Sequence, residues 1–407
     1  MIQKILKHPL FSGGMIMVGG SLVANAVNYL YHLIMGRILG PVDYGVLASI
    51  FSILYIISVV PASASFAIVK FISSAGSEKE RKDIYHGIRN FIIKVSLGIF
   101  VILAVLTMPV SGFLHIDNFW LIALVAPITY INLITLVNQA VSQGILKFEG
   151  SIGPTVISAV FKLGLGLLFV YLGFSVLGAV FGVLLSIVAA YVYSKKFIKR
   201  YNRPDSKTPY NLAPFLKYAL PVLLQAFAFT SLFTMDIILV KHFLPAFDAG
   251  IYAALSTLGK IIYFAVQPIT ATMFPIVNSR RVKGGNYKNI FYLSFAATIA
   301  VSSLVVLFYY LFPNIAIGVL YGKDYLSAKG DLIWMGIFML FYTACYNLAS
   351  FLISVDKVKV VWLTGAAAVA QIVAIFIWHG SIREIIQVSL VITVALTGLL
   401  TVAYAKN

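Results

Sequence analysis

The chain has 407 residues, of which 61% are hydrophobic and 11% are charged, and its mean hydropathy is +0.97. Soluble globular proteins are about 45–50% apolar and about 25% charged, so this composition excludes a water-soluble fold and indicates that lipid surrounds most of the chain. The single cysteine, Cys345, lies in an apolar run and excludes a disulfide framework and a Cys-based metal site. The net charge of +17 fits either a nucleic-acid partner or a membrane surface, and the positions of the charges decide between them.

The first residues, MIQKILKHPLFSGG, resemble the basic start of a signal peptide. The apolar run that follows is longer than that of a signal peptide, contains Asn25 and Asn28, and has no small-residue cleavage site. We therefore expect this run to be retained as a first membrane span.

A helix needs about 20 mostly apolar residues to cross a hydrocarbon core of roughly 30 Å. Twelve segments of the chain have about this length and composition. They are residues 13–39, 44–70, 90–112, 119–142, 153–173, 175–195, 217–243, 249–277, 290–312, 331–354, 360–378 and 383–404. The sequence therefore predicts an all-α membrane protein with twelve transmembrane helices.

Lysine and arginine mark the cytoplasmic loops of membrane proteins. With the N-terminus inside, 23 of the 30 basic residues fall in inner segments and five fall in outer segments. The other two, Lys162 and Lys260, lie well inside spans. This asymmetry predicts a multi-pass protein of the cell membrane with both termini cytoplasmic, whose basic charge faces anionic membrane lipids and not nucleic acid.

Two similar phrases stand at the outer edges of spans, GRILGPVDYG at residues 36–45 and KHFLPAFDAG at residues 241–250. Each contains a cation, a proline, an aspartate and a glycine in the same order. Their alignment pairs Arg37 with Lys241, Pro41 with Pro245 and, after a one-residue insertion, Gly45 with Gly250. The chain therefore contains an internal repeat.

The repeat continues to Pro61 and Pro268, each of which removes a helical hydrogen bond and serves either as a hinge or as a static bend. We predict a six-helix bundle at 1–200, a basic cytoplasmic linker at 201–216 and a second six-helix bundle at 217–407. Halves with the same topology are related by an axis along the membrane normal and bracket a central cavity. This architecture suits transport, although a weak repeat can also be only a relic of the fold.

Polar side chains inside spans are costly, so each is a candidate for function. Asn25, Asn28 and His32 are spaced i, i+3 and i+7, which places them on one face of the first span. This face runs toward Arg37 and either lines the cavity or forms hydrogen bonds between helices.

Asp236 is the carboxylate that lies deepest in a predicted span, about 10 Å below its outer end. The repeat alignment pairs it with His32. Asp236 either binds a coupling cation or neutralises Lys260, which enters the next span to a similar depth.

Lys162 and Lys260 lie too deep to reach the interface comfortably, so each should face an aqueous cavity or an acidic partner. With Arg37 and Lys241 they would form a cationic cavity suited to phosphate. Arg37 and Lys241 are weaker candidates because each could also reach the outer surface.

Catalytic motifs are missing from the sequence. It has no Walker loop, no G-x-S-x-G, no H-E-x-x-H and no CxxC pair, and its predicted outer loops are short. We therefore expect that the chain is not an enzyme and carries no metal site or other cofactor.

The phrase RILGPVDYGVLA, residues 37–48, resembles the first-loop signature of the polysaccharide-unit flippases. This family belongs to the superfamily that also holds the multidrug and toxic compound extrusion transporters and the lipid II flippases. Further similar phrases follow in order along the chain: MDIILVKHFL, GIYAALSTLGK and GVLYGKDYLSA.

The resemblance implies two six-helix bundles around a cationic cavity that accepts the pyrophosphate and sugars of a polyprenyl-linked oligosaccharide. It also implies alternating access coupled to a sodium or proton gradient, with Asp236 at the cation site. Spans eleven and twelve offer Gln371, Gln387, Thr393 and Thr397 but no carboxylate, which leaves the coupling open. Glycan-assembly proteins are the expected partners.

Two alternatives remain open. One is a cation-coupled multidrug exporter of the same fold, which would need an acidic cavity for its cationic substrates. The other is a membrane assembly subunit that transports nothing and would tolerate neutral residues at positions 162 and 260.

Overall fold

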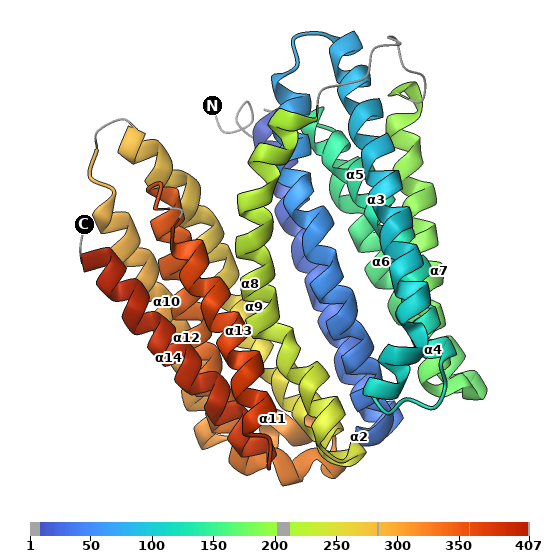
Figure 1. Cartoon of the computed structure of the whole chain (residues 1–407), viewed down its shortest axis with the longest axis vertical. Helices are drawn as coiled ribbons and strands as arrows, with labels where there is room; N and C mark the ends of the chain where they lie inside the picture. Colours follow the sequence, from blue (N-terminus) through green and yellow to red (C-terminus); the bar gives the residue numbers. More distant parts are fainter. Residues whose placement is uncertain (1–8, 202–211, 283–284, 358, 406–407) are drawn as a thin grey trace. The chain divides into compact units, whose positions relative to one another are not determined.

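The computed structural model describes residues 9–201, 212–282, 285–357 and 359–405, and these ranges fold into helices joined by short turns (Figure 1). The first helices are α2 (Pro9–Ser74), α3 (Glu78–Phe113), α4 (Trp120–Ala123), α5 (Val125–Gly144), α6 (Phe148–Phe169), η1 (Val170–Phe174), α7 (Ser175–Ile198) and η2 (Lys199–Tyr201). They are followed by α8 (Ala213–Phe243), α9 (Ala246–Val282), α10 (Lys288–Leu311), α11 (Pro313–Leu320), η3 (Lys323–Ala328), α12 (Lys329–Ser354), α13 (Val360–Ile377) and α14 (Ile382–Ala405).

Ten helical stretches in the described ranges are long and apolar enough to cross a membrane. Two of them, of 46 and 51 residues, are long enough for two crossings each, since a helix rises 1.5 Å per residue. The first of these stretches is broken at Gly40 (φ 72°, ψ 174°), and the second is broken at Gly173 (φ 91°) and Ser175 (φ 44°). The ten stretches therefore supply twelve crossings, which confirms the predicted fold class.

Contacts divide the chain into two units. The first unit contains the chain up to Met35 and Ile53–Leu223, and the second contains Gly36–Ser52 and Leu224–Asn407. The segment 36–52, which the sequence analysis placed in the first bundle, thus packs with the second unit. Residues 202–211 of the predicted linker lie outside the described residues.

Glycine permits the closest helix packing in the first unit. A Cβ atom at Gly182 of α7 would lie 2.7 Å from the backbone nitrogen of Gly166 on α6. Because neither residue has a side chain, the two antiparallel helices pack backbone to backbone, as small residues allow in membranes. At the other end of this unit, an apolar cluster around Tyr85, Ile88 and Tyr201 joins α3, α5 and the end of α7.

A buried polar cluster and a close glycine contact connect the helices of the second unit. Asn347 of α12 is fully buried, and its Nδ2 lies 2.9 Å from the hydroxyls of Thr270 and Ser294 and 3.2 Å from that of Thr298. These hydrogen bonds tie α12 to α9 and α10. Gly259 of α9 gives α12 further room, since a Cβ there would lie 2.9 Å from Met335 Cγ.

The two repeated phrases pack directly against each other inside the second unit. A Cβ at Gly45 would lie 2.9 Å from the Gly250 nitrogen, and a Cβ at Gly250 would overlap the Pro41 carbonyl. Tyrosine hydroxyls surround this contact: Tyr44 lies 3.0 Å from the Thr257 hydroxyl, and Tyr325 donates to the Gly36 carbonyl at 2.7 Å. The segment 36–52 is therefore held on α9 and η3 by glycine packing and tyrosine hydrogen bonds.

Candidate functional site

Four ionisable side chains are buried inside the two units, and each is a candidate for a functional role. Among the described residues, the buried members of Asp, Glu, Lys and Arg are Lys162, Asp236, Lys241 and Lys260, with exposed fractions of 8%, 1%, 4% and 8%. Three carry an amine and one a carboxyl group, so with all four ionised the interior is net positive.

Lys162 is held in the first unit by an aromatic ring. Its Nζ atom lies 4.6 Å from the ring centroid of Tyr31, within the range of a cation–π interaction. The Tyr31 hydroxyl donates to the Ala179 carbonyl at 3.2 Å, which fixes the ring between α2, α6 and α7. Gly166, one turn beyond Lys162, makes room for this ring, since a Cβ there would lie 2.9 Å from Tyr31 Cε2.

The predicted polar face of the first span lies partly beside this lysine. The His32 ring meets the Tyr31 ring edge to face at 5.6 Å, so His32 and Lys162 share one aromatic neighbour. On the same helix, Asn28 is half-buried and Asn25 is exposed. The structure thus connects His32 with Lys162 and leaves the two asparagines farther along α2.

Asp236 lies at the centre of a polar group in the second unit. Its Oδ2 accepts a hydrogen bond from the Tyr252 hydroxyl at 2.6 Å, and its Oδ1 accepts from the Ile237 backbone nitrogen at 2.9 Å. Lys260, two turns beyond Tyr252 on α9, interacts electrostatically with this carboxylate. The structure therefore brings together the aspartate and lysine that the sequence suggested as partners.

An aromatic cluster lies beside this pair. The Lys260 Nζ is 4.5 Å from the Phe233 ring centroid, and Phe233 stacks on Tyr342 with 5.4 Å between ring centroids. Tyr263 and Tyr346 extend the cluster and are only half-buried. Ring faces of this kind can hold the apolar faces of sugars as well as a cation.

Arg37 and Lys241 differ in their surroundings. Lys241 is 4% exposed, so it is enclosed by protein and does not extend to the surface. Arg37 is exposed on the segment 36–52, where its guanidinium donates to the Val319 carbonyl at 3.3 Å. Only Lys241 therefore belongs to the buried set.

Gln371 of α13 adds a polar group one turn from Asp236. Its Nε2 lies 2.9 Å from the Ser389 hydroxyl and 3.4 Å from the Leu232 carbonyl, one turn before Asp236 on α8. Its Oε1 is buried with no hydrogen-bond partner among the described residues. This oxygen is available to a cation or to water. Elsewhere in the described ranges, no cluster of three or more His, Cys, Asp or Glu could hold a metal ion.

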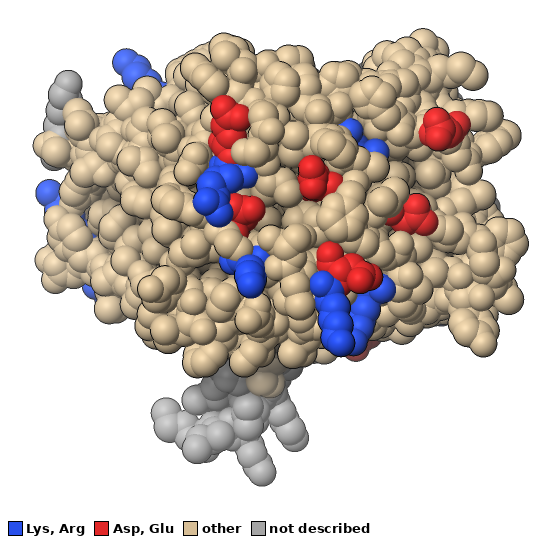
Figure 2. Space-filling model, turned by 90° about the horizontal axis from the view of Figure 1, so that it is seen from below, with Lys and Arg blue, Asp and Glu red and all other residues tan. Residues whose placement is uncertain are grey.

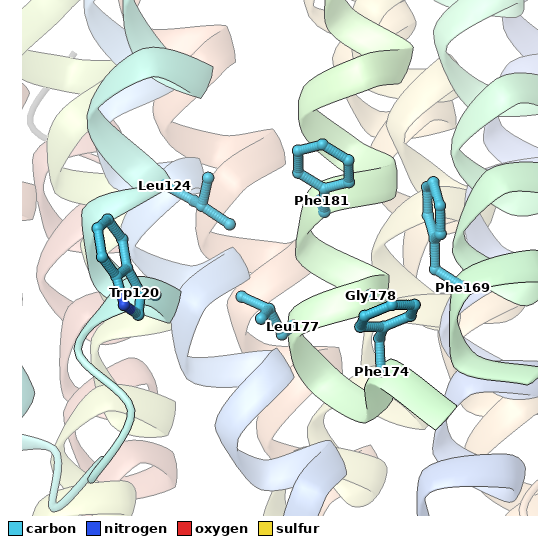
Figure 3. A pocket seen from close by; sticks show the side chains of 7 residues that line it. All are labelled: Trp120, Leu124, Phe169, Phe174, Leu177, Gly178 and Phe181. Atoms are coloured by element: carbon cyan, nitrogen blue, oxygen red, sulfur yellow. The ribbon is translucent and has the colours of Figure 1, made fainter. Parts of the chain in front are cut away.

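An apolar pocket of about 430 Å³ lies at the end of the first unit where α6 and α7 meet (Figure 3). Its lining contains only aromatic and aliphatic side chains and one glycine: Trp120, Leu124, Phe169, Phe174, Leu177, Gly178 and Phe181. Figure 3 shows Trp120 and Leu124 across the pocket from Leu177 and Phe181. Such a lining suits a hydrocarbon chain and not a sugar or a phosphate.

A more polar pocket, of about 440 Å³, lies at the end of the second unit where the turns after α8 and α13 meet the start of α12. Here Arg383 Nε donates to Asp331 Oδ1 at 2.7 Å, and Asp248 also contributes to the lining. Figure 2, which views the end at which α11 lies, shows charged side chains of both signs scattered among uncharged ones. The loop charges predict that this end faces outward, and that orientation stays a prediction.

Sequence reasoning missed Tyr31, Tyr252 and the aromatic cluster. Tyrosine occurs 23 times and phenylalanine 30 times in this chain, so composition and spacing do not distinguish these rings from ordinary lipid-facing ones. A weak signal did exist, because Tyr31 adjoins His32 and Tyr252 follows the second repeated phrase. Only the packing identifies them.

Comparison with known structures shows the fold. The chain resembles an inward-facing multidrug resistance MATE family transporter of the MOP superfamily (TM-score 0.72, 15% identity, 95% of this chain and 98% of that one). It also resembles the lipid II flippase MurJ in an inward closed conformation (0.74, 14%, 95% and 87%) and a MOP superfamily transporter from Pyrococcus furiosus (0.63, 15%, 99% and 98%). Comparison with curated proteins found no similar sequence.

The sequence profile of the polysaccharide biosynthesis protein family matches residues 10–280, which include the first unit, the segment 36–52, Asp236 and Lys260. The two-unit, twelve-crossing architecture is that of the MOP transporters. The resemblance seen in the loop phrases is thereby confirmed. This multi-pass membrane protein belongs to the polysaccharide biosynthesis protein family and has the flippase and transporter fold of the MOP superfamily.

Proposed function

We propose that the chain is a flippase that moves polyprenyl-(pyro)phosphate-linked oligosaccharide from the cytoplasmic to the outer leaflet for surface polysaccharide synthesis. The observation that carries this proposal is the excess of buried amines: Lys162, Lys241 and Lys260 stand against one carboxylate, Asp236. Cationic side chains inside a membrane are expensive and are kept where a charged ligand has to pass. The phosphate groups are the charged part of this cargo.

Each predicted site residue has a role in this proposal. Lys162 and Lys260 attract the phosphates, assisted by Lys241 and Arg37. Asn25, Asn28 and His32 form hydrogen bonds with sugar hydroxyls, and Tyr31 and the aromatic cluster support the sugar rings. The hydrocarbon tail stays in the bilayer.

Transport proceeds by alternating access. The segment 36–52 leaves the first unit at Met35, packs on the second unit and returns at Ile53. It is held there by contacts between backbones and hydroxyls, which can separate without leaving a buried charge unpaired. Undocking of this segment would open the outer side.

Ion coupling is a further part of the proposal. Asp236, with the buried Gln371 oxygen nearby, would bind Na⁺ or a proton on each cycle, and the chain would then act as an antiporter. The competing explanation is that Asp236 only neutralises Lys260. The double variant Asp236→Asn/Lys260→Met removes both charges together and leaves no unpaired charge, so any flipping that remains in it reports on coupling without a broken ion pair. Gradient-dependent flipping that persists in this variant would show that Asp236 is structural.

We place the protein in the cell membrane, with both termini in the cytoplasm and with glycan-assembly proteins as its partners. It acts as a carrier and catalyses no bond formation or cleavage. The basic inner segments hold this orientation through anionic lipid.

The decisive experiment measures flipping of a fluorescent polyprenyl-pyrophosphate oligosaccharide in proteoliposomes. Lys162→Met is expected to lower the rate at least tenfold, because it removes a buried cation but keeps most of the side-chain volume. Lys147→Met, an exposed position that precedes the same helix, is the matched control and should retain the rate. Equal rates for the two variants would refute the role of Lys162.

The same preparation tests the rival functions. A multidrug exporter of this fold should transport cationic dyes and ignore the lipid-linked sugar, and an assembly subunit should transport neither. The net positive interior opposes cationic cargo. One structurally similar transporter, that of Pyrococcus furiosus, is described as having a binding pocket of reverse polarity, which indicates that the fold tolerates such a change.

A further inference from the structure

A second polar group lies at the start of α3, away from the apolar middle of this helix. Arg81, Tyr85 and Arg89 are spaced i, i+4 and i+8 and therefore lie along one stripe of the helix. His86 lies beside this stripe, with its ring 5.3 Å from that of Tyr85. None of the roles proposed above uses these residues.

Three atoms of this group are buried without a partner. Arg81 Nε, the Tyr85 hydroxyl and His86 Nε2 have no hydrogen-bond partner among the described residues. Tyr85 is 1% exposed, whereas Arg81 and His86 are half-buried, so the group is open on one side. A buried polar atom without a partner is unfavourable. Arg81 Nε can only donate, and the Tyr85 hydroxyl and His86 Nε2 are both able to donate, so an acceptor is the partner that suits all three.

Positive charge also lies near Tyr85. Arg89 and Tyr191 of α7 both interact electrostatically with Tyr85. The Lys195 Nζ in turn lies 5.2 Å from the Tyr191 ring centroid. Arg89 therefore lies near the Tyr85 hydroxyl, and Lys195 adds a positive charge on the neighbouring helix α7, beside Tyr191.

The acidic residues at the start of α3 do not fill this position. Glu80 accepts a hydrogen bond from the Gly76 nitrogen at 2.8 Å, in a capping box with Ser77. Glu78 and Asp83 also have interaction partners, and Asp83 lies on a different side of the helix from Arg81 and Tyr85. The positive charge of the group is therefore available to a ligand.

We infer that Arg81, Tyr85, His86 and Arg89 form a binding site for the phosphate group of a membrane lipid. An arginine Nε can only donate a hydrogen bond, so the missing partner must accept one. Several cations around one acceptor favour an anion over water, and arginine binds phosphate oxygens with good geometry. The site lies where α3 enters the membrane, on the inner side in the proposed orientation, which is the depth of lipid phosphates. The inference does not depend on the proposed cargo.

Native mass spectrometry of the full chain in detergent can test this site. The probes are phosphatidylglycerol, polyprenyl phosphate, inorganic phosphate and, as a lipid without phosphate, diacylglycerol. Arg81→Gln/Arg89→Gln is expected to weaken phosphatidylglycerol binding at least tenfold. Lys94→Gln, an exposed cation on the same helix, is the matched control and should change it less than twofold.

Tyr85→Phe is the second variant, because it keeps the packed ring and removes only the hydroxyl. We expect it to weaken binding at least threefold without lowering the melting temperature. Tighter binding of polyprenyl phosphate than of phosphatidylglycerol would identify the cargo carrier as the source of the phosphate, and the reverse order would identify bulk lipid. Equal affinity for diacylglycerol, or unchanged affinity in both variants, would show that the buried donors bind only water and would overturn the inference.

Discussion

Replacement of Gly250 by alanine should detach the segment 36–52 from α9. The added Cβ would overlap the Pro41 carbonyl and would lie 2.7 Å from the Pro41 Cα. Both obstructing atoms belong to the backbone, so no side-chain rotation can relieve the overlap. The segment has to move by about an ångström, since contacts below 3.0 Å are essentially never observed for real Cβ atoms.

The magnitude follows from two opposing effects. Alanine is favoured over glycine inside a helix by about 0.8–1 kcal/mol, whereas overpacking costs typically about 1–3 kcal/mol and occasionally more. Gly98→Ala on α3 is the matched control, because a Cβ there meets nothing within 4 Å. Both variants gain this helix propensity, so it cancels between them, and Gly250→Ala should be less stable than Gly98→Ala by the overlap alone, roughly 1–3 kcal/mol.

Thermal unfolding of both variants in the same detergent measures this difference. For units of about 200 residues, 1 kcal/mol corresponds to roughly 2–4 °C, so the Tm values should differ by at least about 2 °C. If the two alanine variants melt together, the segment does not pack on α9 in solution, and the proposed docking of the outer side fails with it.

Three further substitutions test other parts of the structure by thermal unfolding in detergent. Tyr252→Phe removes a hydrogen bond to a buried carboxylate and should lower the free energy of unfolding by about 1.5–3 kcal/mol. The control Tyr171→Phe, at a position that is 91% exposed, should have no measurable effect, and equal effects would show that the Tyr252 hydroxyl forms no stabilising hydrogen bond. Gly40→Ala should cost roughly 1–2 kcal/mol, because φ is 72° there and an L side chain is strained in that conformation; a stabilised variant would mean that the break in α2 lies elsewhere. Asp331→Asn should cost less than about 1 kcal/mol, since its partner Arg383 is 52% exposed and surface ion pairs contribute little; a larger loss would indicate that this pair belongs to a buried network.

Much of the fold could be read directly from the amino acids. Runs of about 20 apolar residues determine where helices cross a membrane, because every backbone polar group in lipid must be satisfied within its own segment. The twelve crossings and the family resemblance were therefore predictable. The ends of the helices were less predictable. Helix α3 begins at Glu78, twelve residues before the predicted span, because a helix capped by Ser77 continues beyond the hydrocarbon core.

The candidate site was only partly predictable. A lysine or aspartate within an apolar run is visible at once, and the structure confirms that Lys162, Lys260 and Asp236 are buried. Tyr31 and Tyr252, which hold two of these charges, are ordinary residues in an aromatic-rich sequence. Their importance comes from partners 16 or more residues away, which no local pattern specifies.

The sequence alone determined that this is a helical membrane protein with an internal repeat and charged groups inside its spans. Local hydropathy is sufficient for this, since transfer into lipid depends on each segment's own composition. Only the tertiary structure decided that Gly45 meets Gly250, that the segment 36–52 lies with the second unit and that donors at the start of α3 lack acceptors. These features depend on contacts between distant segments, and their energies come from packing and hydrogen bonding after the helices associate.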